Sequence, residues 1–249
     1  MQRLKQKKIL ITGGTSGIGF ETARQCLAEG AEVALTGRRP EAVKAAVDDL
    51  GGGVLGLVSN AGSITDQTAL ADELTKVWGH LDAVYINAGD VTHASMGDWR
   101  EDAFDRIIDT NLKGPFFLLQ ALMPLMSEGA SVILCTSVSI HLGLAQSSVY
   151  AASKAGLASL ARTLSGEWID RGIRVNSLCP GPTRTSALDK LGLSPDAERA
   201  LQDEIAELVP LGRMGEAQEL AKAAVFLASD ESRFIVGTEL IVDGGTANL

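Results

Sequence analysis

Short apolar runs alternate with longer amphipathic segments along most of the chain. The runs cover residues 8–12, 32–36, 54–58, 83–87, 131–137, 174–179 and 239–242. Most of them are unbroken apolar stretches rather than alternating apolar and polar positions, which is typical of strands buried on both faces. The pattern therefore predicts a parallel sheet that helices cover on both sides.

The amphipathic segments between the runs predict helices over 18–29, 41–50, 66–78, 99–126 and 150–171. Glycines follow the first three of these segments directly, as they often do where a helix ends. The repetition of strand and helix indicates a doubly wound, Rossmann-type α/β fold with seven parallel strands and helices on both faces. No segment is rich enough in Pro, Gly or Ser to suggest a linker, so we expect one domain over 1–249.

The region 184–212 breaks this rhythm, because it contains no predicted strand. A helix is predicted to begin at Ser194 and Pro195, with the serine as N-cap and the proline in the first turn. Long excursions after the carboxyl end of a strand often cover ligands in such folds. We therefore expect a substrate lid around 184–212, the alternative being a surface insertion without function.

Composition and charge exclude several classes of function. The net charge of −9 gives no counterion-release advantage on nucleic acid, so no nucleic-acid partner is expected. The N-terminus lacks the apolar core of a signal peptide, and the most apolar stretch, 116–126, is too short to span a bilayer. We accordingly predict a soluble, cytoplasmic protein that has no membrane partner.

The metal-ligating residue types are few and scattered. Three cysteines lie far apart within apolar segments, without any paired C-x-x-C spacing, and are expected to be buried free thiols. The three histidines, His80, His93 and His141, are not spaced as a set of metal ligands. No metal site is predicted from these spacings.

A glycine-rich turn joins the first predicted strand to the first predicted helix. It contains Gly13, Gly17 and Gly19, a variant spacing of the dinucleotide fingerprint G-x-G-x-x-G. Glycines let the backbone turn tightly and approach a ligand, and the helix N-terminus offers free N–H groups to a pyrophosphate. We therefore predict that this turn binds a dinucleotide, the alternative being a tight turn without a ligand.

The end of the second strand bears on which dinucleotide binds. An acidic residue there would accept hydrogen bonds from the ribose 2′-hydroxyl of NAD, but Arg38 and Arg39 stand after Gly37 instead. Guanidinium groups form paired, charge-assisted bonds with a phosphate. The sequence therefore favours NADP(H), with NAD(H) still possible. The alternative is that either arginine faces solvent or pairs with Glu41.

Ser137, Tyr150 and Lys154 form a candidate catalytic set. Tyr150 and Lys154 lie one helical turn apart and share a face, while Ser137 ends the fifth strand. A free phenol stays protonated at neutral pH, and a nearby ammonium favours the phenolate that a general base requires. A serine hydroxyl can donate to a carbonyl oxygen on which charge develops. This chemistry suits interconversion of a ketone and an alcohol.

Taken together, these motifs make the chain similar to the short-chain dehydrogenase/reductase family, in its single-domain Ser–Tyr–Lys form of about 250 residues. The similarity covers essentially the whole chain. The matching pieces, in family order and with family-like spacing, are segment 12–19, Asn87-Ala88-Gly89, Asn111, Ser137, Tyr150 with Lys154, and Pro180-Gly181-Pro182-Thr183.

The resemblance implies catalytic roles for four residues. Tyr150 would be the general acid/base. Lys154 would favour its ionised form and hold the nicotinamide ribose, and Ser137 would bind the substrate oxygen. Asn111 would complete a proton relay through a water near Lys154.

The resemblance also implies a set of cofactor-binding residues. Besides Tyr150 and Lys154, the set is Gly13, Thr15, Ser16, Gly17, Ile18, Gly19, Arg38, Arg39, Asn60, Ala61, Asn87, Ala88, Gly89, Pro180, Gly181 and Thr183. Two positions depart from the family pattern. Asn60 replaces a frequent aspartate that faces the adenine amino group, and its amide oxygen can still accept that bond. Ile86 replaces the first asparagine of the common Asn-Asn-Ala-Gly motif, a change that should not affect catalysis.

We expect an oxidoreductase for a small to medium, apolar ketone or secondary alcohol, and by analogy a homotetramer. The predicted substrate pocket contains Ser139, His141, His93 and Leu188, and further lid leucines support its apolar character. Two alternatives are a 3-oxoacyl carrier-protein reductase, which the acidic charge does not favour, and an NAD-dependent sugar or polyol dehydrogenase. A cofactor-sensing protein without turnover is a third, but a sensor needs no proton donor.

Overall fold

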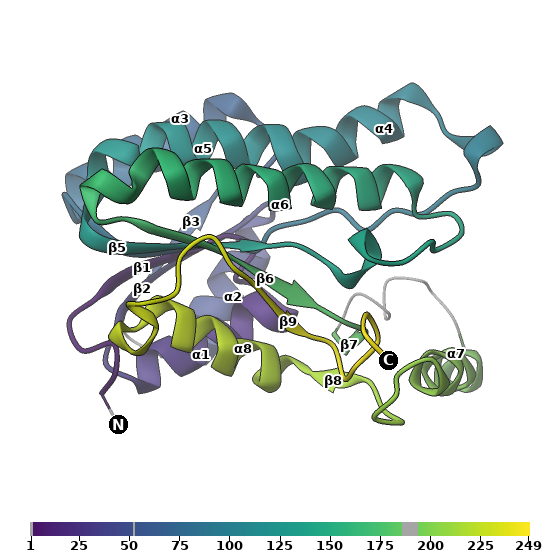
Figure 1. The fold of residues 1–249 in the computed structure, drawn as a ribbon. Coiled ribbons are helices and arrows are strands. Elements are labelled where there is room, and N and C mark those ends of the chain that lie inside the picture. The colour runs from purple at the N-terminus through teal and green to yellow at the C-terminus, as the bar shows by residue number, and fades with distance from the viewer. Residues whose placement is uncertain (1, 52, 186–193) are drawn as a thin grey trace.

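The computed structural model describes residues 2–51, 53–185 and 194–249, and within them a parallel sheet forms the centre of the fold (Figure 1). Seven strands lie in the order β3-β2-β1-β4-β5-β6-β9, and every neighbouring pair is parallel. Their bounds are β1 Lys8–Ile11, β2 Glu32–Gly37, β3 Val54–Val58, β4 Leu81–Ile86, β5 Met126–Cys135, β6 Arg174–Pro180 and β9 Glu239–Val242. The predicted fold class is confirmed, because all seven apolar runs became strands of one sheet.

The strand order fixes where a ligand can bind. The chain builds outward from β1 through β2 to β3, then crosses to β4 on the other side of β1. The loops that leave the carboxyl ends of β1 and β4 lead to helices on opposite faces of the sheet, and folds of this type bind ligands in a crevice at such a switch point. The glycine-rich turn and the segment after Ile86 both lie at this switch point.

Helices cover both faces of the sheet, in two layers that Figure 1 shows above and below it. One layer contains α1 (Gly17–Ala28), α2 (Pro40–Leu50) and α8 (Ala217–Ala228), and the other contains α3 (Ile64–Val77), α4 (Glu101–Ile108), α5 (Gly114–Leu122) and α6 (Ser148–Trp168). Each layer packs on its own apolar core. Leu10, Val84 and Leu134 point into one core, whereas Ile9, Ile11 and Ile133 point into the other. This alternation along each strand explains why the runs are apolar throughout.

The predicted helix over 99–126 is wrong as a single element. After a short 3₁₀ turn at Met96–Asp98, the segment divides into α4, a π-helical stretch at Asp109–Lys113, α5, and a 3₁₀ turn at Met123–Leu125. Strand β5 begins at Met126, which pairs with Leu81 of β4. Helical periodicity alone cannot detect the π turn, because packing rather than propensity determines it.

The predicted helix over 150–171 begins two residues earlier, and its last turn is a 3₁₀ turn at Ile169–Arg171 that Gly172 ends with φ +70°.

The expectation that region 184–212 contains no strand is wrong at its first residue. Arg184 lies in a two-residue strand, β7 (Thr183–Arg184), which pairs with β8 (Gly215–Glu216). The predicted helix start at Ser194 is confirmed: α7 (Pro195–Glu207) follows, and the Ser194 hydroxyl accepts a hydrogen bond from Ala197 N. No helix in the described part of the chain has the length and apolar character needed to cross a lipid bilayer.

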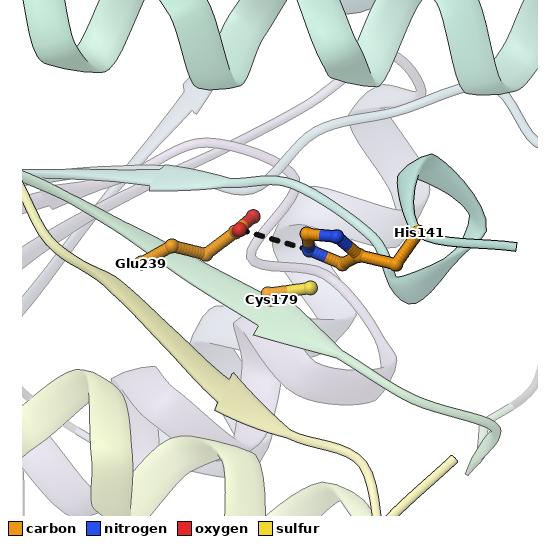
Figure 2. A group of neighbouring side chains, drawn as sticks. All are labelled: His141, Cys179 and Glu239. Carbon is orange, nitrogen blue, oxygen red and sulfur yellow. Dashed lines mark hydrogen bonds and ion pairs between the residues drawn. The ribbon is translucent and has the colours of Figure 1, made fainter. Parts of the chain in front are cut away.

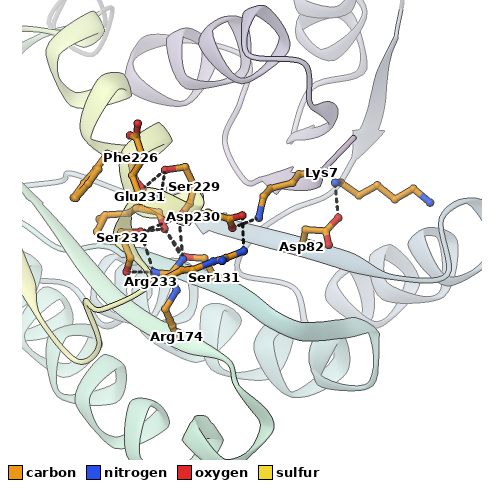
Figure 3. Close-up of polar contacts among 12 residues, drawn as sticks. Lys7, Asp82, Ser131, Arg174, Phe226, Ser229, Asp230, Glu231, Ser232 and Arg233 are labelled. Atoms are coloured by element: carbon orange, nitrogen blue, oxygen red, sulfur yellow. Dashed lines mark hydrogen bonds and ion pairs between the residues drawn. The ribbon is translucent and has the colours of Figure 1, made fainter. Parts of the chain in front are cut away.

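A buried arginine joins the sheet to the α8 layer at the end opposite the crevice (Figure 3). Arg174, the first residue of β6, is 6% exposed. Its guanidinium donates to the backbone oxygens of Leu227, Ser229 and Ser232 at 3.0–3.3 Å, and to the Ser232 hydroxyl at 3.0 Å. These acceptors lie around the C-terminus of α8, where the helix dipole favours a cation. Burial lowers the pKa of the guanidinium, and the nearby charge of Asp230 partly offsets that effect.

Candidate active site

The glycine-rich turn has the backbone that the sequence predicts. Gly13 and Gly17 have φ of +65° and +57°, a region that side chains disfavour. A Cβ atom on Gly19 would lie 2.5 Å from both the Gly13 oxygen and Asn87 Nδ2. Ser16 is the N-cap residue of α1, but its hydroxyl accepts no hydrogen bond from the first turn of the helix. The first N–H groups of α1 can therefore donate to a ligand in the crevice.

The end of β4 holds this turn in place. Thr12 Oγ1 accepts hydrogen bonds from the backbone N–H groups of Asn87 and Ala88, at 3.0 and 3.1 Å. The Asn87 amide donates in return to the backbone oxygens of Thr12 and Gly13, at 3.0 and 3.2 Å. Two loops that are far apart in sequence therefore form one rigid wall of the crevice. Asn87 was predicted as a cofactor residue, whereas the role of Thr12 was missed.

A cavity of about 310 Å³ opens beyond the ends of β2 and β3. Arg38, Asn60 and Thr110 contribute to its lining. Arg38 makes no hydrogen bond or ion pair with any other residue that the structure describes, so its guanidinium is available to a ligand. Arg39 instead lies mostly exposed, 3.7 Å from the Glu41 carboxylate, which is the alternative left open by the sequence.

The other predicted residues of this end of the crevice are held by local contacts. Asn60 Oδ1 accepts a hydrogen bond from Gly62 N at 3.2 Å. The Ala61 backbone oxygen packs against Gly114, where a Cβ atom would lie 1.7 Å from it. Thr15 approaches Gly37 in a similar way, with its methyl group 2.5 Å from where a Cβ would stand. Glycine at 37 and 114 therefore allows Thr15 and Ala61 to pack this closely against the neighbouring backbone.

Tyr150 and Lys154 meet at the other end of the crevice, on one face of α6. Lys154 is buried, and its Nζ donates to the Cys135 backbone oxygen at 2.7 Å. The same Nζ lies 5.9 Å from the centroid of the Tyr150 ring. Ser137 follows Cys135 by two residues, and its Oγ accepts a hydrogen bond from Ser139 N at 3.2 Å. The end of β5 thus anchors the lysine and carries the serine.

Asn111 lies in the π-helical stretch and is buried. Its amide oxygen accepts a hydrogen bond from Asp90 N at 2.7 Å, and its amide nitrogen donates to Asp90 O at 2.9 Å and to Ser153 Oγ at 3.0 Å. Gly89 lies beside it, since a Cβ there would be 3.5 Å from both Asn111 Oδ1 and Lys154 Nζ. The side chain of Asn111 therefore positions the chain after β4, and its predicted relay role stays a prediction.

Sequence reasoning missed the polar network that supports Asn111. The Asp90 carboxylate accepts hydrogen bonds from Thr92 Oγ1 at 2.6 Å and from Arg106 Nε at 2.8 Å. Burial alone would raise the pKa of Asp90, but the hydrogen bonds from Thr92 and Arg106 outweigh it and lower that pKa. Ser153 links this network to α6 by donating to the Tyr150 backbone oxygen at 2.7 Å. A carboxylate one residue after the Asn-Ala-Gly motif was the available signal.

The predicted substrate-pocket residues are placed differently from one another. The His93 ring lies 5.5 Å from the Tyr150 ring, and its Nδ1 is 3.0 Å from Ser147 Oγ. Ser139 is buried, and its hydroxyl has no hydrogen-bond partner among the described residues. His141 points toward β9, where its Nε2 is 2.9 Å from Glu239 Oε2. Leu188, with the lid segment 186–193, lies outside the described residues.

The segment after β6 borders the same crevice. Thr183 Oγ1 donates to Gly181 O at 2.9 Å, and the backbone of Gly181 approaches Asp243, whose Cα would be 2.5 Å from a Cβ at that glycine. Thr185 lies beside Gly17, since a Cβ atom added to Gly17 would be 3.3 Å from the Cβ of Thr185. The segment that begins with the predicted nicotinamide-side residues, from Pro180 to Thr183, therefore reaches the glycine-rich turn at Gly17.

Comparison with known proteins gives a consistent result over nearly the whole chain. A family model described as enoyl-(acyl carrier protein) reductase matches residues 13–247. The chain is 38% identical to oxidoreductase asL5 of Sarocladium schorii, covering 100% of this chain and 99% of that protein. It is 35% identical to a 3alpha-hydroxysteroid dehydrogenase of Mediterraneibacter gnavus, covering 97% of each.

Two solved structures superpose closely on this one. A short chain dehydrogenase/reductase family protein has a TM-score of 0.88 and 36% identity, with coverage of 99% of this chain and 100% of the other. A putative betaketoacyl-ACP reductase has a TM-score of 0.88 and 37% identity, with the same coverage.

Proposed function

The chain belongs to the short-chain dehydrogenase/reductase family, a group of oxidoreductases that act on CH–OH and C=O groups, and from this premise we propose that it reduces an apolar ketone with NADPH. The observation that carries the proposal is the buried Lys154 ammonium, anchored on Cys135 O and 5.9 Å from the Tyr150 ring. A proton donor beside a fixed positive charge suits reduction of a carbonyl group.

The crevice fits a dinucleotide. The glycines at 13, 17 and 19 let the turn pack tightly at the start of α1, and the free N–H groups at that helix N-terminus can bind a pyrophosphate. Arg38 and Asn60 would hold the adenosine end, and Tyr150 and Lys154 would hold the nicotinamide ribose. When bound, the nicotinamide supplies the hydride for reduction or accepts it in the reverse direction.

The remaining chemistry belongs to this chain's own side chains. The Ser137 hydroxyl donates a hydrogen bond to the substrate oxygen and orients it. The Tyr150 phenol donates its proton to the same oxygen as negative charge develops there, and takes the proton back during oxidation. The Lys154 ammonium stabilises the phenolate that remains. The hydrogen bonds of Asn111 to Asp90 and to Ser153 hold the segment after β4 against α6. A relay that carries the proton toward solvent would start near Asn111.

Cofactor preference is tested at Arg38. We expect Arg38→Ala to raise the KM for NADPH roughly ten- to a hundredfold, because the variant loses a charge-assisted hydrogen bond to the 2′-phosphate. The KM for NADH should change little, since NADH has no such phosphate. Steady-state kinetics with both cofactors at a fixed ketone concentration measure the two values.

Arg39→Ala is the matched control, because Arg39 is mostly exposed and faces Glu41. It should shift the NADPH-to-NADH ratio much less than Arg38→Ala. An unchanged ratio in Arg38→Ala would contradict the preference for NADP(H), and NAD(H) would then be the cofactor to consider.

The substrate class is proposed from the relatives. The match to a 3alpha-hydroxysteroid dehydrogenase supports an apolar secondary alcohol or ketone. The similarity to a putative betaketoacyl-ACP reductase keeps a 3-oxoacyl carrier protein as the second candidate, although the net charge of −9 disfavours an acidic carrier. A turnover screen with apolar ketones and a 3-oxoacyl thioester, each with NADPH, separates the two. Tight NADPH binding without turnover on any of them would favour a cofactor sensor.

We also propose that residues 1–249 act as one domain, in a cytoplasmic homotetramer. The large apolar side chains left exposed on α4, α5 and before β9 support an assembly, and they include Phe104, Phe116 and Phe234. The three cysteines are buried free thiols, as a reducing compartment would allow.

The assembly gives a prediction of its own. Sedimentation should give a mass about four times 26.1 kDa, and Phe116→Asp should dissociate the particle because it puts a charge into an apolar contact. Ile64→Asp, on the exposed side of α3, is the control and should leave the mass unchanged. A wild-type monomer would contradict the proposed tetramer.

A further inference from the structure

Three ligand-type side chains from separate elements converge at the edge of the sheet (Figure 2). They are His141, which follows the 3₁₀ turn after β5, Cys179 of β6 and Glu239 of β9. One imidazole nitrogen, the thiol sulfur and one carboxylate oxygen all lie within 4.8 Å of one another. Figure 2 shows the sulfur beside the same edge of the imidazole ring that faces the carboxylate.

The surroundings already orient this cluster. His141 Nε2 lies 2.9 Å from Glu239 Oε2, and the other oxygen, Oε1, accepts a hydrogen bond from Thr136 Oγ1 at 3.0 Å. Thr136 thereby fixes the carboxylate with one oxygen directed at the imidazole. Such outer hydrogen bonds are what commonly hold metal ligands in position. Cys179 is fully buried, while the His141 side chain is about one-third exposed, so the cluster is open to solvent on the histidine side.

We propose that His141, Cys179 and Glu239 bind a zinc-class divalent cation, with water as the fourth ligand. Imidazole nitrogen, thiolate sulfur and carboxylate oxygen are the donors that zinc takes in proteins. Bonds of about 2.0–2.3 Å in a tetrahedron require donor separations of about 3.3–3.7 Å. The three donor atoms now lie within 4.8 Å of one another, so side-chain rotations that move the atoms by about an ångström would bring the widest pair into that range.

Binding would exchange protons for the metal. Burial raises the pKa of Cys179 to about 12, with the charge of Glu239 adding to that effect, so the thiol is protonated in the metal-free protein. The cation takes the place of the thiol proton, and the imidazole binds it through a nitrogen that carries no hydrogen. A free thiol in this state is a poor nucleophile, which argues against reading the cluster as a Cys–His–Glu catalytic triad.

The position of the cluster gives the site a consequence for the proposed enzyme. The metal would join β6 and β9 to the turn that carries Ser137 and Ser139, in the part of the fold next to the predicted substrate pocket. The expectation of no metal rested on sequence spacing, and spacing cannot detect ligands that parallel pairing of β6 with β9 brings together.

Cobalt(II) titration tests the site without any turnover assay. We expect the tag-free, chelator-treated chain to bind one Co²⁺ per protomer, with a thiolate-to-cobalt charge-transfer band and the intense visible bands of a four-coordinate ion. Zn²⁺ should displace the cobalt and bleach these bands. Cys179→Ser should abolish the charge-transfer band, and His141→Gln and Glu239→Gln should each weaken cobalt binding at least tenfold.

The chain provides matched controls for each ligand. Cys26→Ser removes another buried thiol whose pKa burial raises to about 12, and His80→Gln removes another imidazole that faces a carboxylate, that of Asp82. Both should bind cobalt as the wild type does. Absence of the bands in the wild type, or their persistence in Cys179→Ser, would overturn the proposal. Because His141 and Glu239 are partly exposed, their variants should fold, and wild-type cobalt affinity in both would overturn it as well.

Discussion

Tyr150→Phe should lower kcat for ketone reduction about 10²- to 10⁴-fold, the contribution that a positioned general acid typically makes. The substitution removes one oxygen and keeps the ring that packs beside His93. NADPH should still bind, because the glycine-rich turn and the Arg38 cavity are unchanged. The loss should therefore fall mainly on kcat, and the dissociation constant for the cofactor should rise only by the effect of the one hydrogen bond that Tyr150 would make to the ribose.

The measurement is single-turnover oxidation of NADPH together with fluorescence titration of the cofactor. The chain has one other tyrosine, Tyr85, whose hydroxyl is buried without a hydrogen-bond partner among the described residues. Tyr85→Phe is thus a matched control that should keep full activity and cost no stability. Full activity in Tyr150→Phe would show that another group transfers the proton, and the proposed mechanism would be wrong.

Arg174→Met should destabilise the folded chain by about 3 kcal/mol, because buried backbone oxygens around the end of α8 lose their charged donor. Methionine fills much of the vacated volume, so the cost comes mainly from the unsatisfied acceptors. For a chain of this length, that loss corresponds to a fall in Tm of about 6–12 °C.

Urea unfolding followed by circular dichroism, at several protein concentrations, measures the change in the free energy of unfolding. Arg171→Met is the control, since that arginine is exposed and donates a single hydrogen bond, to Met123 O at 2.9 Å. It should cost less than about 1 kcal/mol. If the two variants unfold at the same urea concentration, the buried guanidinium does not stabilise the junction between β6 and α8.

The sheet was largely predictable from the sequence, since residues buried on both faces leave unbroken apolar runs that no other element explains as well. The turn at Gly13 was predictable for a different reason, namely that a backbone with positive φ selects glycine. The break between α4 and α5 was not, because the apolar periodicity of 99–126 continues across it. The π turn that buries Asn111 is stabilised by contacts with Asp90 and Ser153, which no local pattern encodes.

In the candidate site, too, some features were predictable from the sequence and others required the structure. Tyr150 and Lys154 were predictable as neighbours because helical geometry puts positions four apart on one face. The anchoring of Lys154 on Cys135 O, the network from Asp90 to Arg106, and the difference between Arg38 and Arg39 required the structure. Each of these contacts depends on the order of the strands in the sheet and on the side-chain conformation that the neighbouring residues allow.

The sequence by itself determined the fold class, the glycine-rich turn proposed to bind the cofactor, and the identity of the proposed proton donor, because each of these follows from residue types at local spacing. Only the tertiary structure decided which distant groups meet. The pairing of the strands brings His141, Cys179 and Glu239 together at one edge of the sheet. The packing of α8 on the sheet surrounds Arg174 with the backbone oxygens at the end of that helix. The physical reason is that strand pairing and layer packing are long-range, so they bring together residues whose separation in the sequence has no period to reveal it.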